Sequence, residues 1–417
     1  GIPHTKRMPR YYEGARYQAQ WAGFPVERYA NYNGEKDYAE DINCRSFVTN
    51  YLLGGSAYCP DSAGLRVPIE LSFSLHTDAG IHEDDTSIGT LGIYTTDYNN
   101  GRLGNGTLSR HTSRDLTDIV QSYIASETNG LARRAMWNRN YSESRLPDVP
   151  SCIIELLSHQ NFTDMRYAHD PHFKFVASRA IYKGILRYTA EMHDTKYTVQ
   201  PLPIHAFAIN FAGGNKVRLS WRATIDTQEP SAIPEGYILY TRTDDMGWDN
   251  GQRINTTDCE ITLEPGHMYS FKIAAINRGG ESFPSEVLST HISANPKGKI
   301  LIVNGFQRID GPSVVNTTER GGFDLLADPG VPYLGSTAYS GLQHEFSRSM
   351  VGHNDEALQM GASGEELEGT YMAGNTMDYA AIHGTSIRNA GYSFVSCSRQ
   401  AFEDGTVKPN AFDAVDI

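Results

Sequence analysis

The sequence is poor in cysteine and contains no long apolar run. Its 417 residues include five cysteines, an odd number with no CxxC spacing, which predicts neither a zinc ribbon nor a disulfide framework. We expect buried free thiols, with a Cys44–Cys59 bridge as the alternative. No segment approaches the ~20 consecutive apolar residues that span a bilayer, and residues 1–10 are polar and basic, unlike a signal peptide.

Basic residues are also scarce. Lys and Arg number 36 against 49 Asp and Glu, which gives a formal net charge of −13, and no basic stripe is present. Since phosphate neutralisation needs clustered Lys and Arg, we expect no nucleic-acid partner. The GxSxG motif of serine hydrolases is absent as well. The hydrophobic content of 39% is enough for several cores, and the length predicts two to four domains of roughly 100–200 residues.

Helix and strand patterns alternate in residues 10–190. Apolar side chains recur at helical spacing over residues 113–126 and 170–188. Residues 69–75 alternate apolar and polar side chains, whereas residues 151–157 (SCIIELL) form the nearly continuous apolar run of a buried parallel strand. Strands that alternate with helices predict an α/β domain.

Residues 200–294 contain short alternating strands with turn-rich segments about every ten residues, which predicts an all-β sandwich. Trp221 lies on an early strand, and Tyr269 follows Leu263 by six positions. This arrangement resembles the fibronectin type III domain with its tyrosine corner. We therefore expect the side chains of Trp221 and Tyr269 in the core of a seven-stranded sandwich.

The pattern returns to α/β after Pro296. KILIVN (299–304) is typical of a buried strand, residues 376–389 of a helix, 392–397 of a strand, and 412–417 of the beginning of another strand. These elements predict a third, partial α/β domain of flavodoxin-like type. Because the pattern stops on an incomplete strand, we expect the natural chain to continue.

Two residues of the first region are candidates for chemistry. His76 stands at the carboxyl end of an alternating strand, where open α/β sheets gather ligand groups; a structural histidine is the alternative. Glu155 lies inside the apolar strand SCIIELL. Burying an unpaired carboxylate costs several kcal/mol, so Glu155 needs a metal, a catalytic task or, as the competing explanation, a structural arginine partner.

These segments resemble a known family. SFSLHTDAG (72–80) and PSCIIELLSHQNFTD (150–164) are similar to the second zinc-histidine motif and the catalytic-glutamate strand of zinc-dependent N-acetylmuramoyl-L-alanine amidases. The similarity covers about residues 10–190. Together with the other two regions, the chain resembles large envelope proteins described as xanthan-lyase-like. The resemblance divides the chain into an amidase-like domain at 1–196, a fibronectin type III domain at 200–294 and an α/β domain at 298–417.

The resemblance implies a specific activity. His76 would be a zinc ligand and Glu155 the general base, and the scissile bond would be the lactyl–L-alanine amide of peptidoglycan or of a related glycopeptide. It also implies a periplasmic, cell-surface or secreted protein whose partners are peptidoglycan or another surface glycan, and other envelope proteins. The alternative is a non-catalytic amidase-like module for glycan binding or assembly.

One part of the family pattern is missing. The chain has no Gly-His-Gly loop for the first metal ligand; His4 and Glu13, nine residues apart, are the nearby candidates. The other explanation is that these ligands lie on an N-terminal portion outside this sequence, so that the domain is incomplete.

Four further residues are weaker candidates. Asp78, two residues after His76, is a candidate to orient that imidazole or an ordinary turn residue. Arg139, Tyr141 and Arg145 precede the Glu155 strand, and they either contact an acidic peptide stem or glycan or belong to a solvated loop.

Overall fold

The computed structural model describes most of the chain. The described residues are 14–82, 84–104, 106, 108–305, 312–324, 327–328, 336–338, 345–347, 371–373 and 378–417. They form two compact units. The first contains residues 1–194, 310–332 and 336–374, and the second residues 195–309, 333–335 and 375–417. In the described part of the chain, no helix is long and apolar enough to cross a membrane.

The first unit is built on a four-stranded sheet with the order β1-β6-β2-β5. The strands are β1 (Ser72–Asp78), β2 (Thr90–Tyr94), β5 (Trp137–Asn138) and β6 (Ser151–Ser158). β1 and β6 are parallel, β2 is antiparallel to β6, and β5 is parallel to β2. The strand predicted from the apolar run at 151–157 is therefore an inner strand of this sheet.

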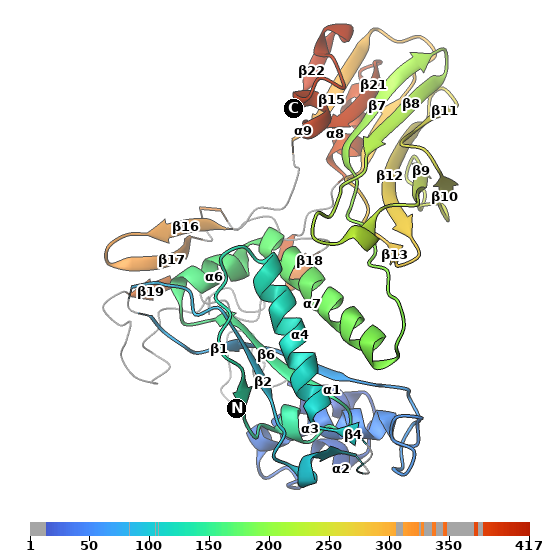
Figure 1. Cartoon of the computed structure of the whole chain (residues 1–417). Coiled ribbons are helices and arrows are strands. Elements are labelled where there is room, and N and C mark those ends of the chain that lie inside the picture. The colour runs from blue at the N-terminus through green and yellow to red at the C-terminus, as the bar shows by residue number, and fades with distance from the viewer. Residues whose placement is uncertain are drawn as a thin grey trace. The chain divides into compact units, whose positions relative to one another are not determined.

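Two long helices, α4 (His111–Glu127) and α7 (Pro171–Met192), lie side by side against one face of this sheet (Figure 1). The spacing of Leu116, Val120 and Ile124 places all three on one stripe, and each is fully buried. They pack with Cys152 and Ile154 of β6. The two helices predicted from the apolar periodicity at 113–126 and 170–188 are thus present.

Shorter elements complete the first unit. The helices are α1 (Ala15–Trp21), α2 (Val26–Tyr29), α3 (Asp37–Leu53), α5 (Ser142–Arg145) and α6 (Phe162–His169). The strands are β3 (Arg102–Leu103), β4 (Leu108–Ser109), β16 (Ser313–Asn316), β17 (Arg320–Asp324), β18 (Ser336–Ala338), β19 (Glu345–Ser347) and β20 (Tyr371–Ala373).

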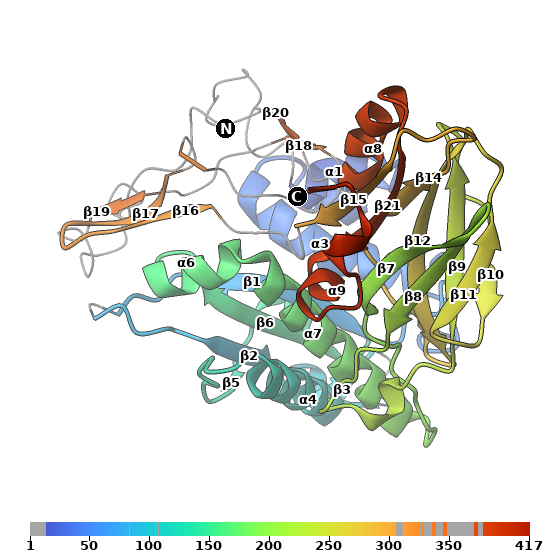
Figure 2. The ribbon, with the colours of Figure 1, turned by 90° about the horizontal axis from the view of Figure 1, so that it is seen from above.

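The second unit contains an antiparallel sandwich. Its strands are β7 (His205–Gly213), β8 (Lys216–Arg222), β9 (Gly236–Thr243), β10 (Gln252–Ile254), β11 (Asp258–Thr262), β12 (Met268–Asn277), β13 (Gly280–Glu281) and β14 (Leu288–His291), which Figure 2 shows from above. Trp221 is 3% exposed in the core, and Tyr269 packs against that core half-buried. The hydroxyl of Tyr269 accepts a hydrogen bond from the backbone N–H of Glu264 at 3.3 Å, as a tyrosine corner does.

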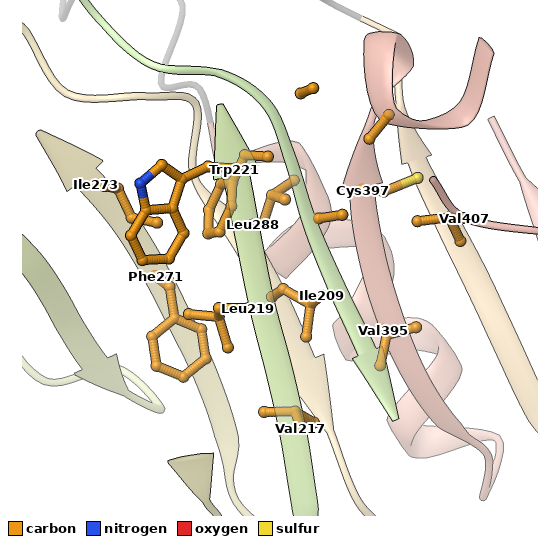
Figure 3. Packing of buried hydrophobic residues seen from close by; sticks show 14 of the residues in the cluster. Ile209, Val217, Leu219, Trp221, Phe271, Ile273, Leu288, Val395, Cys397 and Val407 are labelled. Atoms are coloured by element: carbon orange, nitrogen blue, oxygen red, sulfur yellow. The ribbon is translucent and has the colours of Figure 1, made fainter. Parts of the chain in front are cut away.

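The C-terminal elements were predicted to form a separate domain, but they lie in the same compact unit as the sandwich. They are β15 (Lys299–Asn304), α8 (Tyr379–Asn389), β21 (Ser393–Ser398), α9 (Arg399–Glu403) and β22 (Ala414–Asp416). β15 pairs in parallel with β21 and β22, as expected for an α/β segment. However, β21 also lies between β14 and β7 in the strand order. Figure 3 shows its Val395 and Cys397 in one cluster with Ile209 and Leu219.

The five cysteines are free thiols, and only Cys259 is not fully buried. This agrees with the expectation of free thiols and not with the alternative bridge between Cys44 and Cys59.

Candidate functional site

His76 and Glu155 occupy paired positions on neighbouring strands. Their Cα atoms are partners in the parallel ladder of β1 and β6, and paired residues of neighbouring strands project from the same face of a sheet. The adjacent Cys152 and Ile154 of β6 point to the opposite face, against α4 and α7. The sheet therefore brings together two residues that lie 79 positions apart in the sequence, on the face away from the two long helices.

The Glu155 carboxylate is poorly satisfied. Its Oε2 atom is buried and has no hydrogen-bond partner among the described residues. Burial raises the pKa of the Glu155 carboxyl above its ordinary value, and the neighbouring His76 only partly opposes this shift. No arginine is bonded to Glu155 in the described part of the chain, so the structural Glu–Arg pair that competed with a functional role is not seen.

Glu143 is the carboxylate that contacts His76. Its Oε2 lies 2.8 Å from Nε2 of His76, and Glu143 is on the one-turn helix α5. The hydrogen bond to Glu143 raises the pKa of His76, against the effect of burial. Burial opposes ionisation of Glu143, but the hydrogen bond and charge of His76, together with Arg45, hold the pKa of Glu143 below its ordinary value. The two shifts agree in direction and both favour an ion pair.

Arg45 of α3 extends this contact into a chain of charges. Its Nη1 lies 3.3 Å from both carboxylate oxygens of Glu143, and its Nη2 donates to Oδ2 of Asp41 at 2.9 Å. A pocket of about 260 Å³ lies beside these residues. The pocket is lined by Arg45, Ser46, Thr49, Ser72, Phe73, Ser74, Leu75, His76 and Glu143.

Asp78 does not contact His76 through its side chain. Its carboxylate pairs with Arg134 and accepts from the backbone of Ala79. The position that the sequence suggested for Asp78, next to the His76 imidazole, is occupied by Glu143. Glu143 was not predicted as a site residue, because SESR (142–145) has no pattern that distinguishes it from a loop. The only feature of the sequence that pointed to Glu143 as a site residue was its position between two candidate residues, Tyr141 and Arg145.

The three expected substrate contacts have different surroundings. Arg139 and Tyr141 are exposed, and the Arg139 guanidinium lies over the Trp137 ring. Arg145 is half-buried, with Nη1 donating to Oδ1 of Asn140 at 3.1 Å. Arg139 and Tyr141 are therefore the members of this set that present side chains to solvent.

The donor set for a metal ion is incomplete in the described residues. His4 and Glu13 lie outside them. Within the described ranges, no three His, Cys, Asp or Glu side chains form a group that could hold a metal ion. Zinc sites in enzymes use three protein ligands, so His76 fits zinc only as one member of a larger ligand set.

Comparison with known proteins gives one family match and several distant structural likenesses. Residues 202–291 match the family model of the fibronectin type III domain. The solution structure of the fibronectin type III domain of human fibronectin type III domain containing protein 3 is 24% identical, with a TM-score of 0.20, over 24% of this chain and 91% of that one.

Two amidases are similar to part of the chain. An N-acetylmuramoyl-L-alanine amidase from Clostridium difficile 630 is 17% identical, with a TM-score of 0.27, over 36% of this chain. The match spans 64% of the amidase, which is less than two thirds of its length. The CwlD amidase from Clostridioides difficile, solved in complex with the GerS lipoprotein, is 16% identical, with a TM-score of 0.29, over 38% of this chain and 66% of that one.

Proposed function

We propose that the first unit belongs to a zinc-dependent amide hydrolase that cleaves the lactyl–L-alanine amide of peptidoglycan or of a related glycopeptide. The observation that supports this most directly is the cross-strand pair of His76 and Glu155. The two motifs that resemble the zinc amidases contribute one residue each to this pair. A histidine and a partly buried, unpaired glutamate on one face of a sheet are two of the groups that metal-assisted amide hydrolysis uses, a metal ligand and a general base.

Glu155 is the proposed general base. Its buried Oε2 has no partner, and burial raises the pKa of its carboxyl, which brings a carboxylate closer to the range in which proton transfer is efficient. Glu155 would take a proton from the attacking water and return it to the leaving amine. The amide C–N bond breaks, and the water oxygen remains on the lactyl carbonyl carbon.

His76 is the proposed zinc ligand among the described residues. His4 and Glu13 remain the candidates within this sequence for the others. When bound, zinc would lower the pKa of its water to about 7 and polarise the scissile carbonyl. The exposed side chains of Arg139 and Tyr141 and the half-buried side chain of Arg145 are the proposed contacts for the acidic peptide stem or glycan. With such a substrate, the protein would act in the cell envelope or outside the cell.

The second candidate is a non-catalytic envelope module for glycan binding or assembly. The observation that favours it is the lack of a group of three metal donors within the described residues. A fibronectin type III domain is present at 202–291, and such a domain suits either function as a spacer or interaction unit.

Glu155→Gln separates the two candidates. The amide keeps the shape of the side chain but removes the base, so an enzyme should retain its melting temperature and zinc content while its hydrolysis of muropeptides falls by about 10²–10⁴-fold. Glu191→Gln, at an exposed position on α7, is the matched control and should hydrolyse normally. Wild-type protein that binds no zinc, or that cleaves no muropeptide with or without a chelator, would favour the non-catalytic module.

A further inference from the structure

We propose that the surface around β5 is a binding site for a carboxylate-bearing glycan, built from two exposed aromatic rings that each carry an arginine. The pairs are Trp137 with Arg139 and Tyr98 with Arg145. The inference rests on the proposed function only for the role of Arg139 and Arg145 in substrate binding. It goes further by naming the class of ligand and by adding Trp137 and Tyr98 to the site.

Each arginine lies over the ring of its aromatic partner. The guanidinium carbon of Arg139 is 5.6 Å from the ring centroid of Trp137, and that of Arg145 is 5.6 Å from the ring centroid of Tyr98. Trp137 is 39% exposed and Tyr98 40% exposed, so both pairs reach the surface. A cation–π contact holds a guanidinium group without a hydrogen-bond acceptor, and its N–H donors therefore stay available to a ligand.

Neither arginine is neutralised by a carboxylate in the described part of the chain. The exposed side chain of Arg139 is held there by Trp137. Arg145 donates from Nη1 to the amide oxygen of Asn140, and its buried Nε has no partner among the described residues. Both guanidinium groups thus keep their charge and part of their donor capacity.

The other charges of this surface do not cancel the two arginines. Arg134 also lies over Trp137, 5.6 Å from the ring centroid, but its charge is matched by Asp78. Asp97 is an exposed acidic residue beside Tyr98 in the sequence, and it offsets one positive charge at most. The surface is therefore locally positive, in a chain whose formal net charge is −13.

Hydrogen bonds hold the two pairs in one surface. The loop that carries Tyr98 is bonded to β5 through Thr96 and Asn138, which exchange hydrogen bonds of 3.0 and 2.6 Å. The bond of 3.1 Å between Arg145 and Asn140 ties α5 to the segment after β5. Groups that are fixed before a ligand arrives lose little freedom on binding, so this arrangement suits recognition.

The class of ligand follows from these groups. A guanidinium group binds a carboxylate through two parallel N–H donors, and an exposed aromatic ring offers an apolar face to the C–H groups of a sugar. Two cations are too few for the dense phosphates of a nucleic acid, which the net charge of −13 also repels. A glycan with carboxylates spaced along it matches both the few cations and the rings.

The first measurement is calorimetric binding of oligogalacturonate to the full chain, without added metal. The matched ligand is its methyl ester, which has the same sugar units without the charges. We expect the ester to bind at least about 10-fold more weakly, and we expect salt to weaken binding of the acid through screening. Equal affinity for the two ligands, or no binding of the acid, would overturn the inference.

The second measurement uses variants of one pair. Arg139→Gln removes the donors and Trp137→Ala the ring that holds them, so each should weaken binding of oligogalacturonate by about 5–30-fold. Arg139→Lys should recover only part of the affinity, because an ammonium group keeps the charge without the paired donors. The controls are Trp21→Ala, at an 86% exposed position on α1, and Arg187→Gln on α7. Wild-type affinity in both site variants would overturn the assignment.

Two further ligands test the class. Polyglutamate and a single-stranded DNA oligonucleotide of matched charge should bind more weakly than oligogalacturonate, and tighter binding of either would replace the glycan with an acidic peptide or a nucleic acid. Failure of the proposed function is separable. A protein that binds oligogalacturonate through Arg139 but cleaves no muropeptide retains this site and loses the hydrolase, whereas one that cleaves muropeptides but binds no oligogalacturonate loses this site alone.

Discussion

The indole ring of Trp221 meets the ring of Tyr237 edge to face, with centroids 5.3 Å apart and planes at 75°. Trp221 belongs to β8 and Tyr237 to β9, which are not neighbours in the strand order. The contact therefore joins two strands that share no ladder hydrogen bonds. Both residues belong to the core of the second unit, in which Figure 3 labels Trp221.

Trp221→Ala should lower the free energy of unfolding of the second unit by about 3–5 kcal/mol, because it empties a large aromatic site and removes the contact with Tyr237. Trp221→Phe should cost less, since the Nε1 atom of Trp221 has no partner among the described residues. Ile225→Ala, at a position 59% exposed, is the control. Denaturant unfolding that shows equal midpoints for Trp221→Ala and the wild type would contradict this view of the core.

Tyr269→Phe should cost about 0.5–1.5 kcal/mol, because it removes the hydroxyl that accepts the backbone N–H of Glu264. The ring remains, so its packing against the core is preserved. Tyr38→Phe, at an 81% exposed position, should leave the thermal melt unchanged. A loss as large as that of Trp221→Ala would mean that Tyr269 contributes through packing and not through the corner hydrogen bond.

Gly184→Ala should destabilise the first unit by about 1–3 kcal/mol through overpacking. A Cβ atom at Gly184 would lie 2.9 Å from the Cα of Val120, so α7 would have to move away from α4. The better helix propensity of alanine, worth about 1 kcal/mol, opposes but does not cancel this effect. Gly247→Ala, where a Cβ meets no atom within 4 Å, is the control; a more stable Gly184→Ala protein in thermal melts would show that the helices separate easily.

The pair of His267 and Asp244 should make the second unit less stable at higher pH. Nδ1 of His267 lies 2.6 Å from Oδ2 of Asp244, and this hydrogen bond raises the pKa of His267 in the folded protein. The contribution is complete below the unfolded pKa of about 6.5 and is lost as the pH rises through the raised folded value. The difference in Tm between wild type and His267→Gln should therefore shrink from about pH 5.5 to about pH 8.5; a difference that grows with pH would contradict the pair.

Local patterns in the sequence were sufficient to predict those helices and strands whose apolar side chains are buried. The stripe of Leu116, Val120 and Ile124 predicts α4 because a helix must bury its apolar side, and KILIVN coincides with β15. The place of β21 between β14 and β7 was not predictable in this way. It depends on contacts such as Cys397 opposite Ala208, and nothing local encodes a pairing partner so far along the chain.

The site was predictable only in part for the same reason. Glu155 is conspicuous as a carboxylate in an apolar strand, and His76 as the polar end of another. Glu143 is on a one-turn helix, and its importance comes from Arg45, 98 positions away, and from His76. Asp78 was a candidate because it follows His76 by two residues, but its carboxylate pairs with Arg134. Proximity in the sequence does not determine which side chain reaches the imidazole.

Leu157 adopts φ 66°, in the left-handed region that is rare for a bulky residue, and the ladder of β1 and β6 changes register there. His76 pairs with Glu155, but Asp78 pairs with Ser158, so β6 has one residue more than β1 over this stretch. Deletion of Leu157 would make Ser158 follow Leu156 directly, so that Ser158 stays opposite Asp78 in a regular ladder while Glu155 stays paired with His76. The extra residue is therefore a local feature of the end of β6, and the pairing of His76 with Glu155 does not depend on it.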